Sequence, residues 1–491
     1  TIQVLADCFG LDKSDVEDQV EENPNSRYLI MKKGVSYEKA QEFEKIDEDD
    51  ENYPNVNGIW LEEDYVRTYP YNTLASDVIG FTVSGNVGSN GIEASYNSIL
   101  NGTDGREYGY LSEDSSYEKT VKEAQNGDTV VSTIDLQVQS VVEKYITQFN
   151  EENRSGTTLG SKNTAVMVMN PQNGEIYALV SLPEYDLNEP FVLTKAYEAE
   201  GKNQNDKLND MWRNPVISDS YEPGSTFKII TATAALEERK VTLQDSFFCP
   251  GFKIVEDRKI RCHKTQGHGS ETFKQGVMNS CNPVFMEIGA RVGAKDMLRY
   301  YHKLGLYERT GVDLPGEANS IMHKLDKIGA VELATMSFGQ SIQITPLQLM
   351  RAVSAGINGG RLVTPHFALE KKNPVTKEIT EYEYKEKVGA VSKETSQTLR
   401  EVLEAVVAEG TGKNGQVEGY RVGGKTATSE KLPRRSGKYI SSFLGFAPAN
   451  HPKILGLVLI DEPQGTYYGG VIAAPVMAEI FQNVLPYLDN L

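Results

Sequence analysis

The stretch that decides how this 491-residue chain folds reads Tyr221-Glu222-Pro223-Gly224-Ser225-Thr226-Phe227-Lys228. Helix-forming residues follow it, so we expect a helix from about Ser225 to Glu238 with Ser225 and Lys228 on one face. A serine hydroxyl is a weak nucleophile unless a nearby base accepts its proton, and a lysine with a lowered pKa can be that base. Ser225 is therefore the predicted nucleophile of a covalent reaction, with Lys228 as its base.

The spacing of Ser225 and Lys228 is not unique, because residues 36–39 and 116–119 are also Ser-x-x-Lys strings. What distinguishes the copy at Ser225 is the pair of elements that follows it. They read Ser280-Cys281-Asn282 and, among strand-like apolar residues, Gly424-Lys425-Thr426-Ala427-Thr428. This order resembles the Ser-x-x-Lys, Ser-x-Asn and Lys-Thr-Gly series of penicillin-binding proteins and class A β-lactamases.

The resemblance extends from about Arg67 to the end of the chain, and the chain is similar to class B penicillin-binding proteins. Further segments carry it at residues 126–128 (Asn-Gly-Asp), 133–137, 170–176, 213–215 (Arg-Asn-Pro), 338–340 (Phe-Gly-Gln), 345–348 and 443–448. The Tyr-Glu-Pro-Gly-Ser and Arg-Asn-Pro strings are closer to the division and sporulation branch of that class than to the elongation branch. No glycosyltransferase module fits in so short an N-terminal region, which favours a monofunctional D,D-transpeptidase.

The resemblance implies a mixed α/β (α+β) fold, the serine penicillin-recognising transpeptidase fold, with an antiparallel sheet covered by helices. We expect an irregular α+β pedestal or dimerisation-like domain over residues 1–130 and the transpeptidase domain over residues 131–491. Amphipathic patterns predict helices in the first 45 residues, and short extended runs predict a partly β module over residues 53–126. Short apolar runs at residues 165–169 and 453–460 predict buried strands.

Charge and hydropathy limit the partners and the location of the protein. A net charge of -19 and a pI near 5.0 argue against nucleic acid, or an anionic membrane surface, as a partner bound through overall charge. No stretch comes near the roughly 18 apolar residues that span a bilayer. The resemblance implies an enzyme on the extracytoplasmic face of the cell membrane with one N-terminal anchor. Since the chain opens with Thr1, we expect that this anchor and the first part of the N-terminal domain were removed.

The same resemblance assigns a role to each residue of the three elements. Ser225 would form an acyl-enzyme, Lys228 would accept its proton as the neutral amine, and Ser280 would relay protons. Asn282 would hydrogen-bond the backbone of the substrate. Lys425 would supply a positive potential that lowers the pKa of Lys228 and attracts a terminal carboxylate.

The third element also supplies substrate-binding residues. Thr426 and Thr428 would offer hydroxyls to the terminal carboxylate, and the backbone N–H groups of Ser225 and Thr428 would form the oxyanion hole. The sequence departs from the family here, because Ala427 replaces the glycine of Lys-Thr-Gly. Our hypothesis is that the extra methyl group narrows the site toward bulky β-lactam side chains and slows acylation by some cephalosporins.

Three of the four cysteines cluster in the sequence, and with His268 they form a candidate zinc site. The set is Cys249, Cys262, His268 and Cys281, and a β-hairpin expected over residues 252–262, turning at 256–258, would bring the first two cysteines together. Two alternatives stay open: a disulfide, most naturally Cys262 with Cys281, that acts as a redox switch on the second element, or free buried thiols. Cys8 has no assigned role.

Three functions are compatible with these residues. The first is a peptidoglycan D,D-transpeptidase that is acylated by β-lactam antibiotics, cross-links stem peptides and works with a partner glycosyltransferase. The second is a serine β-lactamase, since the string at residues 184–188 imitates the class A deacylation segment, although it precedes the nucleophile instead of following the Ser-x-Asn element. The third is a non-catalytic scaffold or β-lactam sensor on the same fold. The intact catalytic set favours the transpeptidase.

Overall fold

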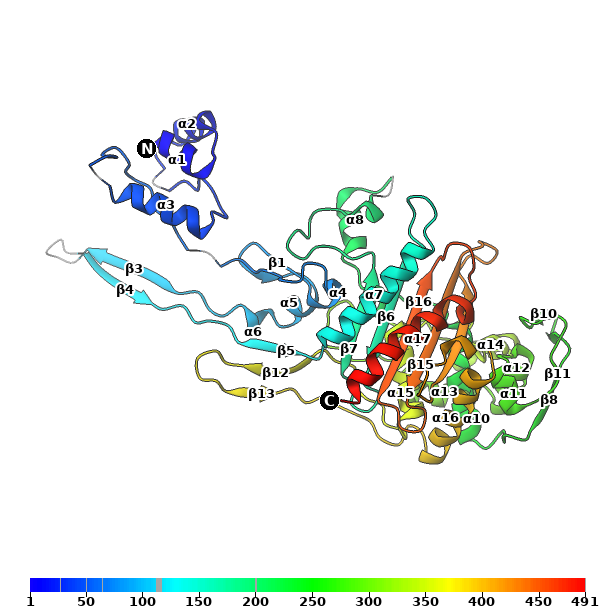
Figure 1. Ribbon diagram of the computed structural model, residues 1–491. Coiled ribbons are helices and arrows are strands. Elements are labelled where there is room, and N and C mark those ends of the chain that lie inside the picture. Colours follow the sequence, from blue (N-terminus) through cyan, green and yellow to red (C-terminus); the bar gives the residue numbers. More distant parts are fainter. Residues whose placement is uncertain (27, 50, 64, 112–116, 199–200, 491) are drawn as a thin grey trace. The chain divides into compact units, whose positions relative to one another are not determined.

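The chain divides into two compact units, Thr1–Arg67 and Thr68–Leu491, which are described separately below (Figure 1). The computed structural model describes residues 1–26, 28–49, 51–63, 65–111, 117–198 and 201–490. The first unit holds helices α1 (Ile2–Phe9), α2 (Lys13–Glu22) and α3 (Tyr37–Asp47) around a small core that includes Phe9 and Phe43. The helices predicted for the first 45 residues are therefore confirmed.

The second unit begins with short elements joined by turns, as predicted for residues 53–126. They are α4 (Ser76–Ile79), β1 (Thr82–Val83), β2 (Val87–Gly88), α5 (Gly91–Ser95), α6 (Asn97–Leu100), β3 (Arg106–Leu111) and β4 (Tyr117–Lys122). β3 and β4 pair antiparallel and extend away from the rest of the unit as a long arm (Figure 1).

A five-stranded antiparallel sheet forms the centre of the second unit, in the order β14-β15-β16-β6-β7. Its strands are β6 (Asn163–Met169), β7 (Ile176–Leu182), β14 (Gly423–Glu430), β15 (Tyr439–Ala447) and β16 (Ile454–Asp461). The strands predicted at 165–169 and 453–460 are confirmed as β6 and β16. The third sequence element lies on β14, at one edge of the sheet.

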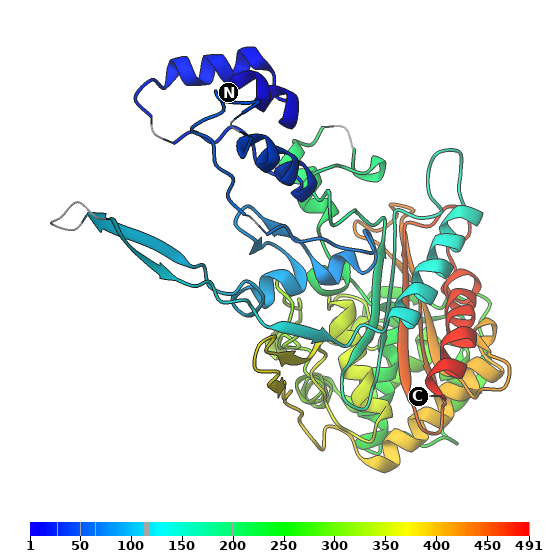
Figure 2. The same cartoon turned by 60° about the vertical axis from the view of Figure 1, so that its left-hand side comes forward.

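Helices cover both faces of this sheet, which explains why its strands are apolar on both sides. On β6, Val166 and Val168 pack toward α7 (Leu136–Glu152) and α17 (Gly469–Leu488), which lie side by side on one face (Figures 1 and 2). Ala165 and Met167 of the same strand join the core of the opposite face. That face is covered by α10 (Lys228–Glu237), α12 (Asn282–Val292), α15 (Pro346–Ile357) and α16 (Lys393–Ala408).

The other elements frame this core. The strands are β5 (Thr129–Ser132), β8 (Ser246–Cys249), β9 (Phe252–Val255), β10 (Arg258–Arg261), β11 (Gly269–Thr272), β12 (Ala368–Lys372) and β13 (Ile379–Glu381). The helices are η1 (Lys195–Tyr197), α8 (Gln204–Met211), α9 (Pro215–Ser218), α11 (Phe273–Met278), α13 (Ala294–Lys303), η3 (Leu325–Lys327), α14 (Ala330–Met336) and η4 (Lys413–Gly415). The hairpin predicted over residues 252–262 is confirmed as β9 and β10.

The expectation that no stretch of the chain is apolar and long enough to span a membrane is wrong. Helix α17 has 20 residues and is long and apolar enough, by length and composition, to cross a membrane. Its apolar residues have another role, because Ala473, Met477 and Phe481 are fully buried against β15, β16 and α7. The helix therefore serves as a core helix of the sheet.

Candidate active site

The predicted nucleophile lies in a tightly constrained turn. Ser225 belongs to a short 3-10 helix, η2 (Gly224–Phe227), which leads directly into α10, so the predicted helix is present with a tighter first turn. Gly224 has a φ of +57°, and a Cβ there would come within 2.2 Å of Ser429 Oγ on β14. Its N–H donates to the carbonyl of Gly339 at 3.0 Å. The turn is thus fixed between the edge strand and residues 338–340, with Ser225 half-buried.

Lys228, one turn after Ser225, is fully buried and held by three hydrogen bonds. Its Nζ donates to Ser280 O at 2.7 Å, to Ser280 Oγ at 3.2 Å and to Asn282 Oδ1 at 2.8 Å. Burial lowers the pKa of Lys228 to about 8, against the opposing influence of nearby negative groups. A lysine with this pKa is neutral in a useful fraction of molecules near neutral pH, which is what a general base requires.

The second element meets Lys228 because of an unusual backbone conformation. Ser280 has a φ of +52°, and Asn282 begins α12 immediately afterwards, so their side chains converge on the same amine. Asn282 Nδ2 also donates to Arg261 O at 3.2 Å, which ties the β9–β10 hairpin to the site. Nothing in the sequence signalled the contribution of Arg261, since it is made by a backbone carbonyl.

Lys425 of β14 is the second buried amine. Its Nζ donates to Thr426 O at 3.1 Å, and burial, followed by the charge of Lys228, holds its pKa well below the ordinary value. We expected Lys425 to lower the pKa of Lys228, but that shift is caused by burial, and the influence between the two amines is instead a lowering of the pKa of Lys425 by Lys228. Two buried amines that repel each other do not both stay charged readily, so at least one amine of the pair favours the neutral form.

The rest of the third element alternates between the two sides of β14. Ala427 is only 4% exposed, and its Cβ lies 3.7 Å from the position that a Cβ on Gly224 would take. Its methyl group therefore faces the nucleophile turn. Thr426 and Thr428 lie on the other side of the strand, where Thr428 is exposed and its Oγ1 accepts a hydrogen bond from Gly469 N at 3.0 Å.

One ion pair at this site was missed by sequence reasoning. Glu222 accepts a hydrogen bond from Ser341 N at 2.8 Å, and its other oxygen pairs with Arg434 in the loop between β14 and β15. The pair joins that loop to the segment before the nucleophile. Its members stand 212 positions apart, so no local pattern could have linked them.

The Ser-x-x-Lys string at residues 36–39 lies at the start of a helix in the first unit. Ser36 is the N-cap of α3 and accepts a hydrogen bond from Lys39 N, which gives it a local structural role. In the string at residues 116–119, Ser116 lies outside the described residues.

Residues 184–188 have a structural role, because they hydrogen-bond to the backbone of residues 69 and 76. Tyr185 donates to Ser76 O at 3.2 Å, and Asn188 accepts from Tyr69 N at 2.9 Å. Burial, aided by the charge of Glu143, raises the pKa of Glu184 to about 9, so Glu184 is protonated near neutral pH. A protonated acid cannot act as the base that a β-lactamase needs for deacylation.

The four residues of the candidate metal site converge in space. Sγ of Cys249, Cys262 and Cys281 and a ring nitrogen of His268 all lie within 4.8 Å of one another, and the three cysteines are buried. The residues come from four places: the end of β8, the end of the β9–β10 hairpin, the start of β11 and the N-cap of α12. All four cysteines of the chain, Cys8 included, are free thiols.

The donor set suits zinc. A tetrahedron with Zn–S bonds of ~2.3 Å has edges of roughly 3.8 Å, and Cys262 Sγ lies 3.7 Å from His268 Nδ1. Hydrogen bonding to Cys281 lowers the pKa of the Cys262 thiol, which favours the thiolate form that binds metals. Glu271 adds a buried carboxylate oxygen, which has no hydrogen-bond partner among the described residues, 3.7 Å from His268 Nδ1.

Comparisons with known proteins cover both units. The family described as the penicillin binding protein transpeptidase domain matches residues 164–482, and the penicillin-binding protein dimerisation domain matches residues 1–132. Stage V sporulation protein D of Bacillus subtilis is 39% identical over 468 residues, which is 92% of this chain and 68% of that protein. A probable peptidoglycan D,D-transpeptidase PenA of Neisseria gonorrhoeae is 31% identical over 438 residues, 87% of this chain and 70% of that protein.

Solved structures of penicillin binding proteins are similar in fold to this chain. Penicillin binding protein 3 of Mycobacterium tuberculosis superposes with a TM-score of 0.73 and 27% identity over 87% of this chain and 91% of that one. Structures of the same protein exist with ampicillin and with aztreonam. Penicillin binding protein 2X of Streptococcus thermophilus, at 23% identity and a TM-score of 0.78 over 99% of this chain and 72% of that one, shares the fold.

Proposed function

Because the chain belongs to the penicillin-binding protein transpeptidase family, we propose that it cross-links peptidoglycan stem peptides through an acyl-enzyme on Ser225. Relatives named peptidoglycan D,D-transpeptidases support this D,D-transpeptidase activity, and the solved complexes support acylation by β-lactams. The observation that carries the proposal is the buried Lys228, held beside the nucleophile turn with a pKa of about 8. A scaffold without activity has no need of such a base.

The reaction follows from the contacts of the site. Ser225 Oγ attacks the carbonyl of the penultimate residue of a donor peptide while neutral Lys228 accepts the hydroxyl proton. Ser280 Oγ, hydrogen-bonded to Lys228 Nζ, passes a proton to the departing amine of the terminal D-alanine. The amine of a second stem peptide then attacks the ester and gives up a proton through the same groups. A peptide cross-link forms and Ser225 is regenerated.

The remaining residues bind and orient the donor peptide. Asn282 offers its amide to the peptide backbone. Lys425 would meet the terminal carboxylate, whose negative charge favours the protonated form of the Lys425 amine. The hydroxyls of Thr426 and Thr428 bind that carboxylate. The N–H groups of Ser225 and Thr428 stabilise the oxyanion, a contribution of the order of 100- to 1,000-fold in rate per donor.

We also propose a structural zinc ion held by Cys249, Cys262, Cys281 and His268. The donor chemistry and the spacing of the four ligand atoms support it. A zinc ion there would connect four chain segments and hold Cys281, which lies between the two residues that contact Lys228. Its contribution is to stability and positioning, and catalysis needs no metal.

We also propose a location and a partner for the enzyme. We place the enzyme at the extracytoplasmic face of the cell membrane on a single N-terminal anchor, beside a glycosyltransferase that supplies new glycan strands. Similarity to stage V sporulation protein D favours a role in sporulation over division. We propose a non-catalytic pedestal over residues 1–130 and a transpeptidase domain over residues 131–491. The dimerisation-domain match to residues 1–132 supports this boundary, whereas the compact units divide after Arg67.

A time course of intact mass after mixing with benzylpenicillin tests the function. We expect one adduct, placed on Ser225 by peptide mapping, that persists for many minutes. An adduct that disappears within seconds while the drug is hydrolysed would identify a β-lactamase instead. Release of D-alanine from a synthetic stem pentapeptide, blocked by prior acylation, then separates an enzyme from a β-lactam sensor.

A further inference from the structure

A cavity lies away from Ser225, at the opposite edge of the central sheet. It has a volume of about 570 Å³ and lies where the turn before β7 meets the three-stranded sheet β13-β12-β5. Three strands, β15, β16 and β6, separate β7 from β14, which carries the third catalytic element. None of the residues that contact Lys228 lines this cavity.

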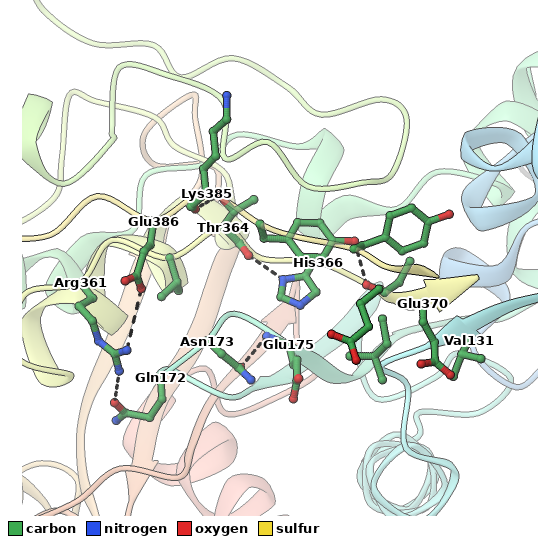
Figure 3. Close-up of a pocket in the computed structure, with 16 residues that line it drawn as sticks. Val131, Gln172, Asn173, Glu175, Arg361, Thr364, His366, Glu370, Lys385 and Glu386 are labelled. Carbon is green, nitrogen blue, oxygen red and sulfur yellow. Dashed lines mark hydrogen bonds and ion pairs between the residues drawn. The ribbon is translucent and has the colours of Figure 1, made fainter. Parts of the chain in front are cut away.

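The floor and one wall of the cavity are built from fixed side chains. His366 is 5% exposed, its Nδ1 donates to Thr364 O at 2.8 Å, and its ring stacks on Tyr384 with ring centroids 3.7 Å apart. The hydroxyl of Tyr384 donates to Ala368 O at 2.8 Å. Figure 3 shows His366 between the two ends of the cavity. Such a prearranged wall loses little entropy on binding.

The two ends of the cavity carry opposite charges. At one end, Arg361 donates to Gln172 Oε1 at 2.7 Å and lies 3.9 Å from Glu386 (Figure 3). Lys385 lines the same cavity and makes no ion pair among the described residues. Figure 3 shows the Lys385 amine pointing away from Arg361, so a ligand carboxylate at this end would pair with Arg361 alone, beside Glu386.

The opposite end is acidic, and two of its carboxylates oppose each other. Glu370 on β12 pairs directly across the ladder with Glu381 on β13, an arrangement of like charges that destabilises a sheet. Glu370 has one ion pair, with Lys372 at 2.8 Å, whereas Glu381 has none among the described residues. Figure 3 places Glu370 at the end of the cavity opposite Arg361. A bound ammonium group would relieve the repulsion.

We propose that this cavity is a second, non-catalytic site that binds an un-cross-linked stem peptide through both its free amine and its free carboxylate. The amine would lie between Glu370 and Glu381, and the carboxylate would face Arg361. This inference rests on the proposed function, since a transpeptidase handles a polymer whose unreacted peptides carry both groups. The site would hold a neighbouring part of the same glycan strand while Ser225 reacts elsewhere along it.

The experiment uses the full chain with Ser225 already acylated by benzylpenicillin, so that the catalytic centre cannot bind peptide. Isothermal titration calorimetry measures binding of a soluble disaccharide pentapeptide with a free amine. We expect saturable binding that weakens with added salt. Glu381→Gln and Arg361→Gln should each weaken it about tenfold, as expected for loss of a charge-assisted hydrogen bond. Glu383→Gln is the matched control, because Glu383 lies on the same segment but does not line the cavity.

Two chemical variants of the probe separate the alternatives. The same compound with its amine acetylated should bind about tenfold more weakly, and the disaccharide without peptide should not bind. Equal binding of the bare disaccharide would identify a sugar site and overturn the proposal. Absence of binding, or an equal loss of affinity in Glu383→Gln, would also overturn the proposal. Failure of the proposed function is a different result, because it appears as absence of acylation before any peptide is added.

Discussion

The catalytic centre and the cysteine cluster share one short segment and use it in opposite ways. In Ser280-Cys281-Asn282, the two outer residues contact Lys228, whereas the thiol between them belongs to the cysteine cluster. At Lys228, burial removes charge from an amine. At the cluster, close thiols favour a thiolate. Residues 280–282 therefore connect the partners of Lys228 directly to the cysteine cluster.

The largest effect should come from removing the nucleophile. Ser225→Ala leaves Lys228 without a hydroxyl to deprotonate, so acylation by benzylpenicillin should fall by at least about 10,000-fold. Intact-mass spectrometry measures it directly. Ser36→Ala is the matched control, since Ser36 has the same spacing to a lysine but caps α3, and it should acylate at the wild-type rate.

A normal adduct on Ser225→Ala would break the assignment of the catalytic centre. The same mass measurement would then have to locate another nucleophile, and peptide mapping of the adduct identifies it.

The second prediction concerns the pH dependence of acylation and tests whether Lys228 is the base. Lys228 must be neutral to accept a proton, and its pKa is about 8. The second-order acylation rate should therefore rise as pH rises, about tenfold per unit below pH 8, and level off above it. Stopped-flow measurements with a chromogenic cephalosporin, corrected for hydrolysis without protein, give the profile. A flat rate from pH 6 to 9 would exclude Lys228 as the titrating base.

Much of this centre was predictable from the sequence, and the limits of prediction have physical causes. The order of the motifs along the chain predicted that Lys228, Ser280 and Asn282 would lie together, and their side chains do meet. Helix α10 and strands β6 and β16 followed from periodic apolar patterns. The Glu222–Arg434 pair and the carbonyl of Arg261 could not be found, since both depend on how distant segments meet. The low pKa of Lys228 was expected, but its first cause, burial, depends on packing.

The third prediction tests the cysteine cluster and sharpens its link to catalysis. Purified protein should contain about one zinc per chain, and Cys249→Ser should lose most of it. Because the metal would join four segments, the melting temperature should fall by roughly 3 °C or more, and acylation should slow several-fold as residues 280–282 loosen. Elemental analysis, calorimetry and the mass assay measure these effects. Cys8→Ser, whose thiol lies in the other unit, is the control.

Protein that carries no metal, and whose melting temperature is unchanged by a chelator, would contradict the zinc proposal. Treatment with a mild oxidant then distinguishes the remaining alternatives. A decrease in mass by two hydrogen atoms, mapped to Cys262 and Cys281, would favour the disulfide, and unchanged mass would favour free buried thiols.

The smallest effect should come from Ala427, where the structure refines the sequence hypothesis. Its methyl group is buried against the nucleophile turn and does not face the exposed side of β14 that bears Thr428. Ala427→Gly should therefore raise acylation by bulky cephalosporins only about two- to threefold. It should also lower stability by about 1 kcal/mol, through the lost burial of a methyl group and the greater freedom of glycine in a strand. Acylation rates for benzylpenicillin and a bulky cephalosporin, with melting curves, measure both effects. Identical rates for every drug would refute a steric role for Ala427, whereas a gain of tenfold or more would mean that the methyl group reaches the drug directly.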